Sequence, residues 1–385
     1  MALVTIANGG DNIGVYAPLF AHVNKMQIPL YVITWLVLTA CWCALAFAVV
    51  KHPRIKMLFA RFGKLILPVF LILLGSWIMS DFITWLFLKH AFAQSKKQVA
   101  ITIDDVPFTQ WSDATPLQVK KAANEKLLQA FTAGKVPVTL FINEITLQGT
   151  EEKARIDVLA KWLENPLVTA GNHGYQHANF NTTSVDDFQQ EVVKGEVITR
   201  QLLSRFKKPL KYFRFPYNAT GKDSVSRFAL EAFLKSKGYI STPFTIESQD
   251  YSFASRYQSE LDKGATQAAE QTGRDYVAYT LKTFAYFEKV TQEQYGRPIA
   301  QIYLCHDNQL NADYMPLLLA ELTKAGYDFK SLDEVMRDPV YQSTSCYTGP
   351  YGFSWLYRWE KDLKRRREMM MGQPEMDTPI EPKKN

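Results

Sequence analysis

Two long hydrophobic runs stand near the start of the sequence. The first covers residues 28–50 and has no charged residue, and the second covers residues 65–88 with one polar interruption at Ser80 and Asp81. About 20 apolar residues are enough for a helix to cross a bilayer, and helices buried in soluble proteins are usually shorter. The pattern therefore predicts two transmembrane helices. Residues 3–20 are less apolar and are a candidate for a third, broken one.

The loop between the two runs predicts their orientation. It carries five cations and no acidic residue: Lys51, Arg54, Lys56, Arg61 and Lys64. The positive-inside rule makes such a loop cytoplasmic, so everything after about residue 90 is expected outside the membrane, in the periplasm or beyond the cell. The sequence Ala91-Phe92-Ala93 is similar to a signal-peptidase site, which makes release by cleavage after Ala93 an alternative to anchoring.

From residue 97 the pattern changes to short hydrophobic strands that alternate with helices. The predicted strands are 98–103, 136–142, 167–170, 212–215, 239–242 and 299–304, and the predicted helices are 117–133, 152–163, 185–206, 225–237 and 314–325. This alternation is typical of an α/β fold with a parallel sheet. A length of about 230 residues suits a (β/α) barrel. Residues 252–297 interrupt the rhythm and are expected to form a helical insertion.

The chain is thus expected to have three parts. Residues 1–90 form a membrane region, residues 97–340 a catalytic domain, and residues 341–385 a charged helix followed by a disordered, Pro-rich polar tail. The net charge of +6 is scattered, without a basic stripe, which argues against a nucleic-acid partner. Four cysteines in a chain of 385 residues do not make a disulfide framework.

Groups able to do chemistry follow the predicted strands. Asp104 and Asp105 end the first strand, His173 and His177 follow the third, and His306 follows the last. In parallel α/β folds these strand ends meet at one edge of the sheet. Two histidines and one aspartate form the open three-ligand set that catalytic zinc uses. A second carboxylate and a separate histidine can then serve as general base and general acid.

Five short motifs in this part resemble, in order, those of the polysaccharide deacetylases of carbohydrate esterase family four. They are Thr102-Ile103-Asp104-Asp105, His173 with His177, Arg214-Phe215-Pro216-Tyr217, Glu247-Ser248-Gln249-Asp250-Tyr251, and Leu304-Cys305-His306. The resemblance implies a distorted (β/α) barrel of the deacetylase type. It implies a divalent metal, expected to be zinc, on Asp105, His173 and His177, with Asp104 as general base and His306 as general acid.

The resemblance also implies the supporting roles. Arg214 would orient the base, Asp250 would orient the catalytic histidine, and the backbone N–H of Tyr217 would stabilise the oxyanion. The acetyl pocket would be lined by Leu304, Tyr251 and Pro216. Three residues depart from the family pattern. Gly174 replaces a hydroxyl residue, which suggests a looser loop around the metal ligands, Tyr251 stands where a tryptophan is usual, and Glu247 replaces an aspartate of secondary role.

The first 80 or so residues resemble a different family, the cadmium resistance transporters. The similarity lies in residues 4–13, in Arg61-Phe62-Gly63-Lys64 and in Leu67-Pro68-Val69. It covers roughly the C-terminal part of such a transporter, which favours a remnant reused as an anchor in membrane lipid. Transport or binding of a divalent cation remains the alternative, because polar residues inside a membrane often mark ion paths.

The expected function is hydrolysis of acetyl groups, chiefly N-acetyl groups, on a cell-envelope or extracellular polysaccharide. An inactive, sugar-binding relic of such an enzyme is a further alternative. The presence of every expected metal ligand, the base and the acid in the sequence argues against that alternative.

Overall fold

The computed structural model describes residues 28–51, 72, 97–112 and 115–376. The chain divides into two compact units, Met1–Ala93 and Gln94–Asn385. Each unit is described by itself.

In the first unit, a single long helix is described, α2 (Ile28–Lys51), over the first predicted membrane span. Several of its large hydrophobic side chains are exposed, among them Trp42 and Phe47. Within the described residues, no helix is identified that combines enough length with enough apolar character to cross a membrane. Apart from Ile72, the second predicted span lies outside the described residues, as do residues 3–20 and the Ala91-Phe92-Ala93 site.

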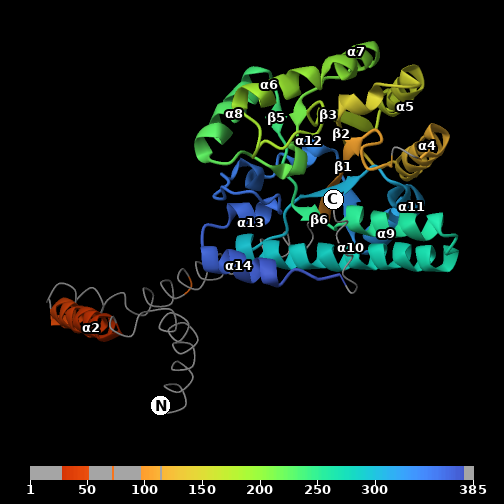
Figure 1. Ribbon diagram of the computed structural model, residues 1–385. Helices are drawn as coiled ribbons and strands as arrows, with labels where there is room; N and C mark the ends of the chain where they lie inside the picture. The colour runs from red at the N-terminus through yellow and green to blue at the C-terminus, as the bar shows by residue number, and fades with distance from the viewer. Residues whose placement is uncertain (1–27, 52–71, 73–96, 113–114, 377–385) are drawn as a thin grey trace. The chain divides into compact units, whose positions relative to one another are not determined.

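The second unit is built on a parallel sheet of eight strands (Figure 1). The strands are β1 (Lys97–Val106), β2 (Val138–Ile142), β3 (Val168–Asn172), β4 (Tyr212–Phe213), β5 (Ile240–Ser241), β6 (Ile246–Glu247), β7 (Gln301–His306) and β8 (Tyr327–Phe329). Seven of them lie in the order β5-β4-β3-β2-β1-β7-β6, and β8 pairs with β1. The predicted parallel α/β architecture is confirmed, as an open half-barrel.

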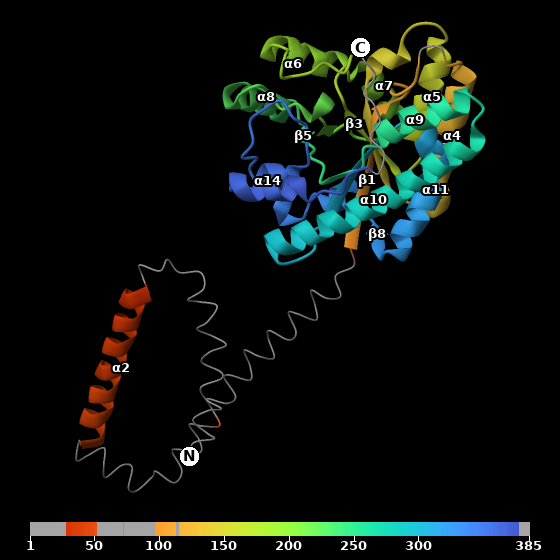
Figure 2. The same cartoon turned by 60° about the horizontal axis from the view of Figure 1, so that its bottom comes forward.

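Helices flank this sheet, as Figures 1 and 2 show. The longer ones are α4 (Leu117–Gly134), α5 (Glu152–Glu164), α6 (Val185–Lys194), α7 (Val197–Phe206), α8 (Ser224–Ser236), α9 (Asp250–Asp262), α10 (Thr266–Tyr295) and α11 (Gln309–Lys324). Short elements are η1 (Glu144–Leu147), η2 (Pro216–Asn218), α12 (Leu332–Val335), η3 (Pro339–Gln342), α13 (Trp355–Trp359) and α14 (Leu363–Met371). Helices α9 and α10 are the predicted helical insertion.

The single helix predicted over residues 185–206 is wrong in one respect, because the structure divides it into α6 and α7. Gly195 ends α6 where the chain passes very close to another loop. A Cβ at Gly195 would lie 2.5 Å from the carbonyl carbon of Gly174. The helix therefore ends at a contact with the loop that carries His173 and His177.

The sheet is open between its two end strands, β5 and β6, and a C-terminal segment lies across this opening. The backbone N–H of Trp355 donates to the carbonyl of Phe244 (3.0 Å), and Ser354 Oγ donates to the carbonyl of Thr245 (2.6 Å). Trp355, Leu356, Tyr357 and Trp359 are buried. Part of the segment after residue 340 thus packs on the half-barrel and contributes to its core.

Candidate metal centre and catalytic site

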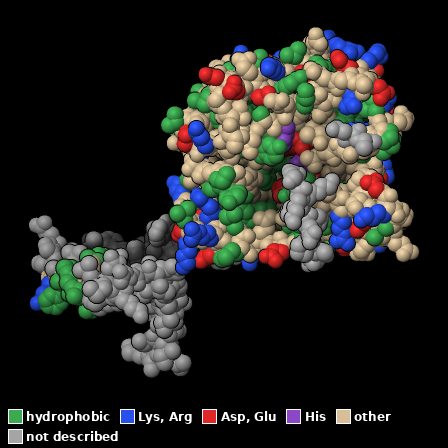
Figure 3. All heavy atoms as spheres, viewed as in Figure 1, with side chains coloured by type: hydrophobic (Ala, Val, Ile, Leu, Met, Phe, Trp, Pro, Cys, Tyr) green, Lys and Arg blue, Asp and Glu red, His purple; other side chains and the backbone are tan. Residues whose placement is uncertain are grey.

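The predicted site residues gather where β1, β3 and β7 end. Asp104 and Asp105 lie near the end of β1, His173 follows β3 directly, and His306 is the last residue of β7. Asp104 and His306 are register partners on neighbouring parallel strands, so their Cα atoms lie opposite each other. Figure 3 shows histidine side chains reaching the surface beside acidic ones on one face of the domain.

Asp105, His173 and His177 form a compact ligand set. Asp105 Oδ1 lies 3.1 Å from His177 Nε2 and 3.6 Å from His173 Nε2. One ligand atom from each residue lies within 4.8 Å of the other two. Among the described residues, buried Asp105 Oδ1 has no hydrogen-bond partner, which is costly for a carboxylate oxygen. A cation between the three side chains would satisfy this oxygen, and the donor set suits zinc.

Two of the ligands are oriented by neighbours. Asp105 Oδ2 accepts a hydrogen bond from Gln110 Nε2 (2.8 Å), which leaves Oδ1 facing the histidines. His173 Nδ1 bonds the carbonyl of Arg214 (2.8 Å), which directs Nε2 toward Asp105. Burial, followed by the charge of His177, lowers the pKa of His173 to about 3. The imidazole of His173 is therefore neutral near pH 7, as a metal ligand must be.

The loop that contains His173 and His177 is stabilised by hydrogen bonds with side chains outside the five motifs. Asn143 Nδ2 donates to the carbonyl of His173 (2.6 Å), and Glu191 accepts from the N–H of Gln176 (2.9 Å). The N–H of Gly174 donates to Asn172 Oδ1 (2.7 Å). Gly174 has φ +77°, a conformation that favours glycine over the hydroxyl residue usual in the family.

Asp104 is held by a buried arginine. Arg214 Nη1 donates to Asp104 Oδ1 (2.6 Å) and to Thr102 Oγ1 (2.7 Å), and the guanidinium lies over the ring of Phe141. The other oxygen of Asp104 lies 3.8 Å from His173 Nε2, toward the metal ligands. Burial raises the pKa of Asp104 above its usual value, although the charge of Arg214 opposes the shift. A carboxylate with a raised pKa is a better proton acceptor, as a general base requires.

His306 is oriented and charged by Asp250. His306 Nδ1 lies 2.7 Å from Asp250 Oδ1, and the backbone N–H of His306 donates to Asp250 Oδ2 (2.8 Å). Asn311 Nδ2 also donates to Asp250 Oδ2 (2.6 Å), a contact for which the sequence carried no signal. Burial alone would lower the pKa of His306, but Asp250 outweighs it and raises this pKa to about 10. His306 therefore carries a proton to give at neutral pH.

The remaining predicted residues surround these groups. The ring of Tyr217 packs edge-on against that of His177, with centroids 4.3 Å apart, and Tyr251 packs edge-on against His306 at 6.0 Å. Pro216 is buried at the start of η2, and Leu304 is buried two residues before His306 on the same face of β7. The eleven predicted site residues thus lie in or near the ends of strands, in the segments that follow them, or at the start of α9.

The backbone around the site is strained at several points. Asp105 (φ +65°), His177 (+60°), Tyr217 (+55°) and Gln249 (+52°), which precedes Asp250, all adopt left-handed conformations. Each costs about 1 kcal/mol or more for a residue other than glycine. Such residues cluster at functional sites when the surrounding structure holds them in place.

Two known families match different parts of the chain, and the boundary between the matches lies within a few residues of the boundary between the two structural units. Residues 92–237 match the family model described as polysaccharide deacetylase, and residues 1–88 match the model described as cadmium resistance transporter. No curated protein sequence matches the chain.

Several solved structures have a low level of similarity. One is a mutant of the CE4 family pseudoenzyme BA3943, with 15% identity and a TM-score of 0.43, over 63% of this chain and 68% of that one. Another is the peptidoglycan deacetylase PdaC from Bacillus subtilis, with 16% identity and a TM-score of 0.40, over 63% and 90%. A third is the Bc1960 peptidoglycan N-acetylglucosamine deacetylase, with 16% identity and a TM-score of 0.43, over 63% and 88%.

The family models confirm both resemblances drawn from the motifs. The matched region of the second unit contains Asp104, Asp105, His173, His177 and Arg214. The chain therefore combines a region similar to polysaccharide deacetylases, residues 92–237, with a region similar to cadmium resistance transporters, residues 1–88.

Proposed function

We propose that the second unit hydrolyses N-acetyl groups on a polysaccharide of the cell envelope or its surroundings, with a divalent metal, zinc, as cofactor. One observation carries the proposal. The unpartnered Asp105 Oδ1 faces two histidines and lies beside a second carboxylate whose pKa is raised by burial. This combination supplies the ligands and the proton acceptor that metal-assisted hydrolysis needs.

The metal would be held by Asp105, His173 and His177. When bound, zinc lowers the pKa of a coordinated water and polarises a carbonyl group. Asp104 takes the proton of the attacking water, and Arg214 keeps its carboxylate turned toward the site. The Tyr217 N–H donates to the developing oxyanion. Leu304, Tyr251 and Pro216 line the space for the acetyl group.

His306 completes the reaction by giving a proton to the departing nitrogen. An amine leaves readily only when it is protonated, so an acid that is still charged at neutral pH suits an amide substrate. Asp250 keeps His306 protonated at neutral pH, because its carboxylate raises the pKa of His306 to about 10. The same arrangement would also accept an O-acetyl ester, which needs less help from the acid.

Acetate release from acetylated glycans tests the proposal. We expect the purified full chain to release acetate from oligomers of N-acetylglucosamine or from peptidoglycan, and to lose this activity with a chelator and regain it with zinc.

Asp104→Asn should lower kcat by about 10²- to 10⁴-fold and leave the bound zinc unchanged. An exposed carboxylate, Asp157, gives the matched control in Asp157→Asn, which should retain activity. Full activity of Asp104→Asn would refute the role of the base.

The pH profile tests the pairing of His306 with Asp250. The alkaline limb of kcat/KM should report loss of the proton from His306, whose pKa is about 10. In Asp250→Asn the carboxylate is gone while the burial that lowers the pKa of His306 remains. The alkaline limb should therefore move to lower pH, and activity at neutral pH should fall. An unchanged alkaline limb would show that His306 is not the acid.

We propose also that the second unit lies outside the cytoplasmic membrane. The cation-rich loop after the first hydrophobic run and the transporter match of residues 1–88 support this placement. A protease added to intact spheroplasts should then digest the second unit. Protection until the membrane is lysed would place it in the cytosol.

Transport of a divalent cation by residues 1–88 is the second candidate function, supported by the match to the transporter model. Cells producing the full chain with Asp104→Asn should then tolerate cadmium better than cells without the chain. Equal tolerance would dismiss this candidate.

A further inference from the structure

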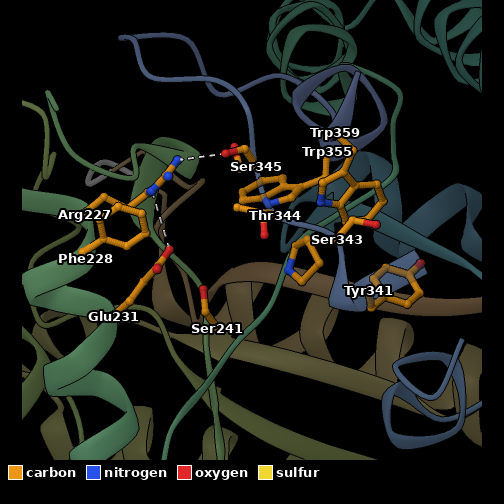
Figure 4. A pocket seen from close by; sticks show the side chains of 11 residues that line it. Arg227, Phe228, Glu231, Ser241, Tyr341, Ser343, Thr344, Ser345, Trp355 and Trp359 are labelled. Atoms are coloured by element: carbon orange, nitrogen blue, oxygen red, sulfur yellow. Dashed lines mark hydrogen bonds and ion pairs between the residues drawn. The ribbon is translucent and has the colours of Figure 1, made fainter. Parts of the chain in front are cut away.

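The C-terminal segment of residues 344–359, here called the strap, packs against the loop that contains Tyr217 and Asn218. It follows the half-barrel's last strand and crosses the opening between β5 and β6. Figure 4 shows a cavity beneath it, with Trp355 and Trp359 on one side and Arg227 and Phe228 of α8 on the other. Arg227 Nη1 donates to the carbonyls of Ser345 and Tyr347 (3.4 and 3.2 Å) and so ties the strap to α8.

Arg358 connects the strap to the loop that follows the third motif. Its Nη2 donates to the carbonyl of Asn218 and to that of Tyr351, both at 2.8 Å, and its Nη1 donates to Thr220 Oγ1 (3.2 Å). Arg358 is 1% exposed, and its guanidinium lies 4.2 Å from the centroid of the Trp355 ring. Burial lowers the pKa of Arg358 to about 10, so the side chain is still charged at neutral pH.

A guanidinium is planar, and the directions of its N–H groups are fixed. The carbonyl of Asn218 and the carbonyl of Tyr351 are therefore held in one defined arrangement around Arg358. This arrangement joins the strap to the residue next to Tyr217, the proposed oxyanion donor.

The strap also lies directly against Tyr217 itself. A Cβ built on Gly352 would lie 2.0 Å from the carbonyl oxygen of Tyr217, so the two backbones are in close contact and only glycine fits. Tyr217 and Asn218 are consecutive residues with left-handed conformations, φ +55° and +50°. Such a pair is unfavourable for residues other than glycine and needs support from its surroundings.

We propose that Arg358, together with Gly352, is a positioning element that holds the Tyr217 N–H where it meets the oxyanion of the reaction. This inference rests on the proposed deacetylase function. Arg358 and Gly352 contact Tyr217 and its neighbours, and their contacts do not involve Asp105, His173 or His177. Their loss should therefore lower the rate of the chemical step and leave metal binding intact.

The test compares two variants with matched controls in the purified full chain. Arg358→Lys keeps the positive charge but removes the planar guanidinium that donates to the carbonyls of Asn218 and Tyr351. Gly352→Ala adds a methyl group that would clash with the carbonyl oxygen of Tyr217. Arg366→Lys changes another buried arginine of the C-terminal segment, which bonds the carbonyl of Glu360. Gly372→Ala adds a methyl group that meets only ordinary contacts of 3.4 Å and longer.

We expect Arg358→Lys and Gly352→Ala to lower kcat by about 100-fold, with KM changed less than about threefold and zinc content unchanged. The amides of residues 217–220 should exchange hydrogen faster in both variants. The two controls should keep the wild-type kcat and exchange rates.

Three results would overturn the proposal: wild-type kcat in folded Arg358→Lys and Gly352→Ala, loss of zinc together with activity, or an equal loss of kcat in the controls. A wild-type chain that releases no acetate would instead refute the proposed function. In that case hydrogen exchange still tests the positioning role, since unchanged exchange at residues 217–220 would show that Arg358 does not hold the loop.

Discussion

Arg214 is fully buried beneath the site and connects several of its parts. Its guanidinium bonds Asp104 and Thr102 on β1, lies over Phe141 on β2 and donates to the carbonyl of Pro243 after β5. Its own carbonyl holds the ring of His173. A buried charge of this kind is stable only while its partner is present, and removal of one partner costs about 3–5 kcal/mol. The side chain of Arg214 therefore connects the proposed base on β1 with β2 and with the segment after β5, and the backbone of the same residue orients one proposed metal ligand.

Two further sets of contacts hold other parts of the site in place, one at His306 and one at Tyr217. On one side, Asp250 is held by Asn311 and in turn holds His306, so the acid is fixed by residues of α9 and α11. On the other side, the strap presses on Tyr217 and Asn218. Tyr217 and Asn218, two consecutive left-handed residues, are thus kept in place by contacts from a distant part of the chain. Strain at the site is tolerated because these contacts lie outside it.

Much of this could be predicted from the sequence. Strands β1 and β7, which carry Asp104 and His306, contain clear hydrophobic runs, and the spacing of His173 and His177 is local, so the strand pattern and the motif order located these residues. Strands β6 and β8, of two and three residues, were missed. The break at Gly195 depends on the approach of Gly174, a contact between distant residues that no local pattern encodes. The hydrogen bonds of Asn143 and Arg358 could not be predicted for the same reason.

The central claim is that Asp105, His173 and His177 hold one cation within reach of Asp104. It is tested most directly by a crystal structure of the zinc-loaded chain, with diffraction data collected on both sides of the zinc absorption edge. We expect a single anomalous zinc peak about 2.0–2.2 Å from Asp105 Oδ1 and from the Nε2 atoms of both histidines. A zinc-loaded crystal with no peak among these three side chains, or with its peak on other residues, would contradict it.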